Sequence, residues 1–151
     1  MTAPRPRSAT LRVAAAQATS VPGEVAANVA TAVSLLDAAA ARGARVLVLP
    51  ELFLTGYDPA TWSPRTALTT DDSRLARVRV AAARYDVVVV AGAAVRRTDD
   101  ASAGPVTLSL LVVDPRGDVT APYDKQHLFD TEQKHFTPGD HGATVVVDGW
   151  E

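Results

Sequence analysis

The sequence predicts an α/β protein built on a largely parallel β-sheet. Two long apolar runs, residues 45–49 and 87–95, read as buried strands, and the first lacks alternation, which is typical of a strand covered on both faces. A short alternating segment at residues 11–17 predicts another strand. Helical periodicity separates it from the run at 45–49. Strand, helix and strand in about 40 residues form a βαβ unit with a right-handed crossover.

Two helices are expected to pack on this sheet. The first begins near Glu24 and ends at Gly43, because glycine readily adopts the left-handed conformation that follows a helix. Its apolar residues share one helical face: Val25, Val29, Ala32, Val33, Leu36 and Ala40. Asp71 or Asp72 can cap a second helix that runs to about Tyr85, with Leu75, Val78 and Ala82 as its apolar stripe.

The remaining chain predicts short strands joined by turns within one domain, residues 11–151, after a flexible tail at 1–10. Strands are expected at residues 106–113, near Val119 and at 144–147, and polar turns at 96–104 and 114–117. The stretches 50–70 and 123–142 are long loops, which are often functional in compact domains. The residues from Gly149 onward resemble the start of a further hairpin.

Composition excludes several classes of function. A formal net charge of −2 gives no field for attracting nucleic acid or anionic lipid, so neither is an expected partner. The longest apolar run is far shorter than the roughly 18 residues of a membrane helix. With no cysteine, the sequence itself can supply neither a disulfide nor a thiolate, and the lack of disulfides fits a cytoplasmic protein.

A few charged residues could carry chemistry, although each has a simpler interpretation. Glu51 directly follows a buried strand, where ligand sites gather in open α/β sheets. Its apolar neighbours should partly desolvate it, which raises the pKa of a carboxyl group toward that of a general base. A solvated acid is the alternative. Lys125 could stabilise an oxyanion, yet lysines mostly lie on surfaces, and Glu132 is unremarkable by itself.

Other catalytic and binding motifs are missing from the sequence. The three histidines lack the helical spacing of a zinc motif, so no metal ligand is predicted. Neither a serine-hydrolase elbow nor a glycine-rich phosphate loop is present.

Several short motifs, taken in order, resemble the nitrilase or carbon–nitrogen hydrolase superfamily. The resemblance spans nearly the whole chain from Leu11 and is strongest in the order and spacing of its parts. These parts are residues 13–17, Asn28, residues 43–52 ending in Pro50-Glu51-Leu52, residues 54–57 (Leu-Thr-Gly-Tyr), Tyr123-Asp124-Lys125, His127-Leu128-Phe129, Glu132 and residues 136–140 (Phe-Thr-Pro-Gly-Asp).

The resemblance implies a fold, a reaction and residue roles. The fold is the nitrilase-type α-β-β-α sandwich, here the incomplete N-terminal half. The reaction hydrolyses small amides, carbamoyl compounds or nitriles through a Glu-Lys-Cys triad, without metal or organic cofactor. Glu51 would be the general base and Lys125 would stabilise the tetrahedral intermediate. Glu132 would help to position the substrate and the catalytic groups, and Tyr57 would contact substrate. Family members commonly pair, which predicts a homo-oligomer.

The sequence also departs from the family pattern. The nucleophilic cysteine of the family lies on a strand soon after the position of Glu151, so the chain as given is predicted to be inactive. Asp124 replaces the arginine usual before the lysine, and Thr107-Leu108-Ser109 replaces an aromatic–Asn–Ser element. Three hypotheses compete: part of a hydrolase, a non-catalytic pseudoenzyme or interaction module, and an unrelated α/β binding module, which the ordered motifs disfavour.

Overall fold

One β-sheet organises the residues that the computed structural model describes, 10–97 and 104–151. Its strand order is β1-β2-β3-β4-β5. The first three strands are parallel and the last two are antiparallel to their neighbours: β1 (Val13–Ala15), β2 (Val46–Val48), β3 (Val88–Arg96), β4 (Val106–Val113) and β5 (Val119–Asp124). The predicted βαβ unit is therefore present, and antiparallel strands extend the sheet beyond it.

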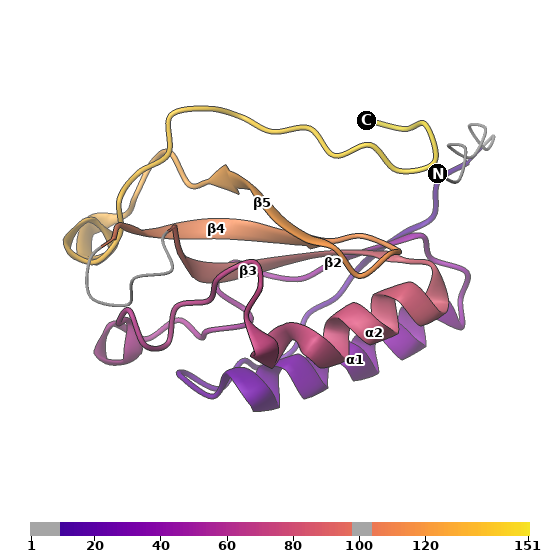
Figure 1. Ribbon diagram of the computed structural model, residues 1–151, viewed down its shortest axis with the longest axis horizontal. Coiled ribbons are helices and arrows are strands. Elements are labelled where there is room, and N and C mark those ends of the chain that lie inside the picture. Colours follow the sequence, from indigo (N-terminus) through magenta and orange to yellow (C-terminus); the bar gives the residue numbers. More distant parts are fainter. Residues whose placement is uncertain (1–9, 98–103) are drawn as a thin grey trace.

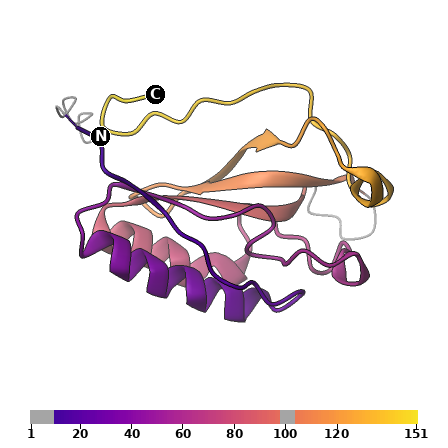
Figure 2. The same cartoon turned by 180° about the vertical axis from the view of Figure 1, so that it is seen from behind.

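Two helices cover one face of the sheet, as Figures 1 and 2 show from opposite sides. They are α1 (Val25–Ala40) and α2 (Ala76–Tyr85). The predicted apolar stripes face inward: Leu36 of α1 and Val78 of α2 are buried in one cluster with Leu47, Val89 and Leu111 of the sheet. Helical spacing of apolar residues thus produces the main core of the protein.

The opposite face of the sheet, here called the open face, is covered only in part. In both views the C-terminal segment, drawn in yellow, runs back over this side. Its Val147 packs against Val46, Val88 and Val112. Between such contacts Val48 remains 37% exposed. The expectation that residues 45–49 are covered on both faces is therefore wrong for Val48, because no second layer lies over it in the described chain.

The predicted strand at residues 144–147 is also wrong. Only Val147 makes a β-bridge, and its partner is Trp150 in an adjoining tight turn. Residues 144–146 form no strand, since no neighbouring strand offers them hydrogen bonds. The turn itself was anticipated: Asp148 and Gly149 have φ of 50° and 79°, as a two-residue hairpin turn requires. Asp148 is paired with Arg45 at 2.8 Å, which fixes the turn to the start of β2.

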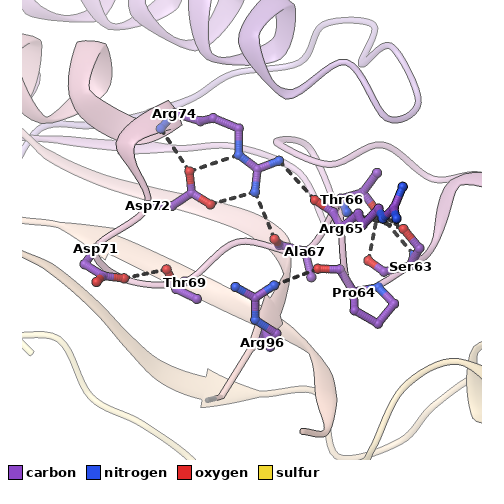
Figure 3. Close-up of polar contacts among 10 residues, drawn as sticks. All are labelled: Ser63, Pro64, Arg65, Thr66, Ala67, Thr69, Asp71, Asp72, Arg74 and Arg96. Atoms are coloured by element: carbon purple, nitrogen blue, oxygen red, sulfur yellow. Dashed lines mark hydrogen bonds and ion pairs between the residues drawn. The ribbon is translucent and has the colours of Figure 1, made fainter. Parts of the chain in front are cut away.

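The long loop between β2 and α2 is tied to the sheet by polar contacts (Figure 3). Arg74 pairs with Asp72 at 2.6 Å and donates to the carbonyl oxygen of Ala67 at 3.0 Å. Arg96 of β3 donates to the carbonyl oxygen of Pro64 at 2.8 Å. Burial acts to raise the pKa of Asp72, but its hydrogen bonds with Arg74 outweigh this and lower the pKa. The loop is therefore a fixed part of the structure.

Several element boundaries differ from the expected ones by a few residues. Asp72 does act as a cap, but for a 3₁₀ turn, Ser73–Leu75, that leads into α2. Strand β5 extends through Asp124, so the loop expected from Tyr123 begins later. The tail at 1–10, apart from Thr10, and most of the turn at 96–104 lie outside the described residues. None of the helices in the described chain is long and apolar enough to cross a bilayer.

Candidate active site

Three charged side chains from two distant parts of the sequence meet on the open face. The ammonium nitrogen Nζ of Lys125, at the end of β5, lies 3.0 Å from Oε2 of Glu51 and 2.9 Å from Oε2 of Glu132. Glu51 follows β2, and Glu132 belongs to a 3₁₀ helix, Asp130–Lys134. The residues singled out by the family resemblance therefore share one site, with one cation between two carboxylates.

Glu132 is the buried acid of this site, with no exposed surface. It accepts hydrogen bonds from the backbone N–H of Phe129 at 2.7 Å and from the hydroxyl of Tyr57 at 2.8 Å, in addition to the ammonium of Lys125. Burial acts to raise the pKa of Glu132, but these three donors outweigh it and the pKa is lowered. Glu132 is therefore ionised at neutral pH.

Lys125 is held by its backbone as well as by its charge. Its N–H donates to the carbonyl oxygen of Leu108 at 2.7 Å, and its own carbonyl accepts from Gly139 at 3.0 Å. Burial acts to lower the pKa of Lys125, but hydrogen bonds to Glu132 and Glu51 outweigh it and raise the pKa. The ammonium therefore stays protonated at neutral pH, as electrostatic stabilisation of an oxyanion requires.

Glu51 is partly desolvated, and its side chain remains 44% exposed. Its neighbours Leu52 and Phe53 are fully buried. The Glu51 carboxylate itself lies 3.0 Å from the ammonium of Lys125. Its role as a general base stays a prediction.

Tyr57 links the site to an aromatic cluster. Its hydroxyl donates to Glu132, and its ring packs edge-on against Trp62 with centroids 5.1 Å apart. The hydrogen bond to Glu132, followed by burial, raises the pKa of Tyr57, so the phenol stays neutral and acts as a donor. The ring remains half exposed beside Lys125 and Glu51. It can therefore contact a ligand as well as orient Glu132.

The acid next to Lys125 does not enter the site. Successive side chains of a strand point to opposite faces, and Asp124 accordingly points away from Lys125. Asp124 accepts from the hydroxyl of Ser109 at 2.5 Å and pairs with Arg97. Ser109 in turn is 2.7 Å from the hydroxyl of Thr107. The two departures from the family pattern are therefore neighbours, and Asp124 binds Ser109 instead of competing for the ammonium.

Sequence reasoning missed how strongly Glu132 and Asn28 are bound. The amide of Asn28 accepts from the N–H of Val21 at 2.7 Å and donates to the carbonyl oxygens of Val21 and Leu54. It thereby joins the loop before α1 to the turn after Glu51. The only local signal for Glu132 was its position three residues after Phe129, where a glutamate can accept from the helix N-cap N–H.

The arrangement suits acid–base chemistry and the stabilisation of a developing negative charge. A protonated ammonium, an exposed carboxylate and a neutral phenol face the same space, and the buried carboxylate of Glu132 fixes two of them. In the described chain, no group of three or more His, Cys, Asp or Glu side chains is arranged to hold a metal ion.

Comparison with known proteins decides the family. The sequence profile described as "Carbon-nitrogen hydrolase" matches residues 12–149. The chain belongs to the carbon–nitrogen hydrolase family. The chain is 34% identical over 111 residues to a 2-oxoglutaramate amidase from Bacillus subtilis, covering 70% of the chain and 40% of the relative. It is also 35% identical over 126 residues to a nitrilase from Pyrococcus abyssi. That match covers 82% of the chain and 46% of the nitrilase.

A solved amidase shares the fold of this family member. A variant of the amidase from Nesterenkonia sp. AN1 superposes with a TM-score of 0.73 at 26% identity, covering 91% of this chain and 53% of that one. That amidase shows Michael addition of acrylamide at its active site cysteine. The expected nitrilase-type fold is thus confirmed as a partial α/β fold, and the chain spans about half the length of the proteins it matches.

Proposed function

We propose that the chain supplies the Glu–Lys part of an active site that hydrolyses small amides or related carbon–nitrogen bonds. The observation that carries this proposal is the contact of Lys125 with both Glu51 and Glu132 on the open face. The family and its amidase and nitrilase relatives support the class of reaction. The sequence contains no cysteine, so the thiol has to come from residues outside it.

In this proposal each side chain has a separate role. Glu51 takes the proton of the thiol, whose sulfur attacks the carbonyl carbon of the amide. The carbonyl oxygen becomes an oxyanion beside the ammonium of Lys125, which has a third N–H donor beyond those used by the two carboxylates. Glu51 returns the proton to the leaving nitrogen as the C–N bond breaks. Water, deprotonated by Glu51, then cleaves the thioester and releases the carboxylic acid.

Glu132 and Tyr57 act on position and substrate. Glu132 is buried, ionised and bound to Lys125, so it fixes the ammonium without itself facing solvent. Tyr57 orients Glu132 through its hydroxyl and offers a half-exposed ring to a substrate. Uncharged amides suit this site, because its two carboxylates and one ammonium give a formal charge of −1 that disfavours a free carboxylate on the substrate.

The test begins with the coding sequence beyond Glu151. A frame that continues into a strand with a cysteine supports the hydrolase, and a stop codon supports the alternative, a non-catalytic interaction protein. The protein of the continued frame is then assayed for ammonia release from small amides, including butyramide and acrylamide. Glu51→Gln should lower kcat/KM by about 10²–10⁴-fold and Lys125→Ala by about 10²–10³-fold.

The matched control is Lys134→Ala, which removes the other lysine of the chain from an exposed position. It should leave kcat/KM unchanged. The 151-residue chain alone should release no ammonia above its own Lys125→Ala variant. Turnover by the unmodified 151-residue chain would contradict the assignment of the missing thiol, and equal losses for both lysine variants would remove Lys125 from the reaction.

We also propose that the chain associates with itself through the open face. Val48 and the ring of Tyr57 are exposed there. Phe129, three residues before Glu132 in the sequence, is 68% exposed. Exposed apolar surface of this kind favours association between protein chains.

A further inference from the structure

The turn that carries Glu51 has an unusual backbone. Leu52 has a φ of 52°, a left-handed conformation that side-chain-bearing residues other than Asn, Asp and His rarely adopt. Its side chain is nevertheless fully buried. Such conformations are strained and persist only where the surroundings enforce them. Something adjacent must therefore hold this turn in place.

Gly92 of β3 is the residue beneath the turn. A Cβ atom at this position would lie 2.5 Å from the nitrogen of Leu52, 2.6 Å from Cα of Glu51 and 2.6 Å from the oxygen of Pro50. All three are backbone atoms, so no side-chain rotation can make room. The turn can therefore lie directly on the sheet only because residue 92 has no side chain.

Hydrogen bonds fix the turn at this close approach. The N–H of Gly92 donates to the oxygen of Pro50 at 3.2 Å, and the oxygen of Gly92 accepts from the N–H of Leu54 at 3.0 Å. One residue therefore binds the backbone on both sides of Glu51. The Glu51 side chain itself is half exposed, so this backbone, rather than enclosing side chains, sets where its carboxylate lies.

We propose that Gly92 is a positioning residue for Glu51: its missing side chain lets the strained turn settle against β3 and brings the Glu51 carboxylate within reach of Lys125. The catalytic importance of Gly92 rests on the proposed function, whereas its effect on the position of Glu51 does not depend on it. Adding one methyl group at position 92 pushes the backbone of Glu51 away from the sheet. The Glu51–Lys125 pair then opens, while Lys125 keeps Glu132.

The test measures the pKa of Lys125 in the 151-residue chain. Lysine labelled with ¹³C at Cε gives two signals, from Lys125 and Lys134, and Lys134 reports changes that affect the whole molecule. Glu51→Gln removes one of the carboxylates that raise the pKa of Lys125, so that pKa falls. Gly92→Ala should lower it by a similar amount. In the double variant Glu51→Gln/Gly92→Ala, the second change should add nothing.

The matched control is Gly142→Ala, since a Cβ atom there meets nothing within 4 Å. It should leave the Lys125 titration unchanged. A Gly92→Ala variant that lowers the melting temperature but keeps the wild-type pKa of Lys125 would overturn the proposal, as would an additive effect in the double variant. Either result would make Gly92 a purely structural residue.

A second pair of variants covers the case in which Gly92→Ala does not fold. Leu52→Val disfavours the same turn without adding an atom, because β-branched residues rarely adopt positive φ. Leu108→Val is its control, since it makes the same change in a strand residue of the cluster around Leu52. Leu52→Val should lower the pKa of Lys125 and Leu108→Val should not. Equal pKa values in these two variants would overturn the proposal.

The outcome is separable from that of the proposed function. If the pKa coupling is found but the protein of the continued frame releases no ammonia, the turn positions Glu51 in a site with another use. If ammonia is released and the coupling is absent, the hydrolase stands and Gly92 has no positioning role.

Discussion

The two faces of the sheet differ in what covers them and in what they do. The helix-covered face holds the main core, in which Leu36 of α1 meets Leu47 and Leu111 of the sheet. The open face has smaller apolar clusters, a C-terminal segment laid across it and the Glu51–Lys125–Glu132 site. Because successive side chains of a strand point to opposite faces, the same strands place the residues of the main core on one face and the charged site on the other.

The sharpest test of this contrast uses two adjacent leucines of β4. Leu111 is fully buried on the helix-covered face, whereas Leu110 points to the open face and is half-buried. Leu111→Ala should lower the free energy of unfolding by about 2–5 kcal/mol, through lost burial and a residual cavity. Leu110→Ala should lower the free energy of unfolding by roughly 1–2 kcal/mol, because less apolar surface is buried there. Urea denaturation of both variants measures the difference, and equal losses would show that the faces contribute alike.

A smaller effect is expected from acid titration of the site. The lowered pKa of Glu132 means that its contribution to stability is present above the unfolded-state pKa and is lost as pH falls through the folded-state value. Glu132→Gln should therefore flatten the decline of stability with acid. Asp130→Asn, an exposed change on the same 3₁₀ helix, is the control. The test is the melting temperature of each protein measured from pH 7 to pH 2. Parallel curves of melting temperature against pH for wild type and Glu132→Gln would refute the prediction.

The smallest effect on stability, but the clearest on association, concerns exposed valines. Val48 on the open face is 37% exposed and Val80 on the outer side of α2 is 69% exposed. Val48→Lys should shift the chain toward monomer, because a charge opposes burial in an interface. Val80→Lys should leave association unchanged, with stability altered by no more than about 0.5 kcal/mol. Sedimentation velocity measures both, and dissociation by Val80→Lys alone would move the interface to the helices.

Local patterns predicted the helix-covered face well. Apolar residues at helical spacing predicted which side of each helix is buried, as for Val29 and Leu36 of α1 and Val78 of α2. The strand expected at residues 106–113 has the same bounds in the structure. The open face was less predictable. The burial of Glu132 depends on Tyr57, which is distant in sequence, and the exposure of Glu51 depends on what covers the sheet. Residues 144–147 had strand propensity but no strand to pair with.

The grouping of the site residues was predicted only through family resemblance. Nothing in the segments around Glu51 and Lys125 indicates that they meet, because the contact depends on the register of β4 and β5 and on the approach of a turn to Gly92. The relation of Asp124 to Ser109 was equally hidden, although the two residues are directly opposed on neighbouring strands.

The Asp148–Gly149 turn gives the polypeptide a return route. It reverses the direction of the C-terminal segment, and the Arg45–Asp148 pair fastens the reversal to the far end of the sheet. The anchored reversal keeps Val147 in contact with Val46, Val88 and Val112. One ion pair therefore shields that end of the open face from solvent, without any strand pairing between the C-terminal segment and the sheet in the described residues.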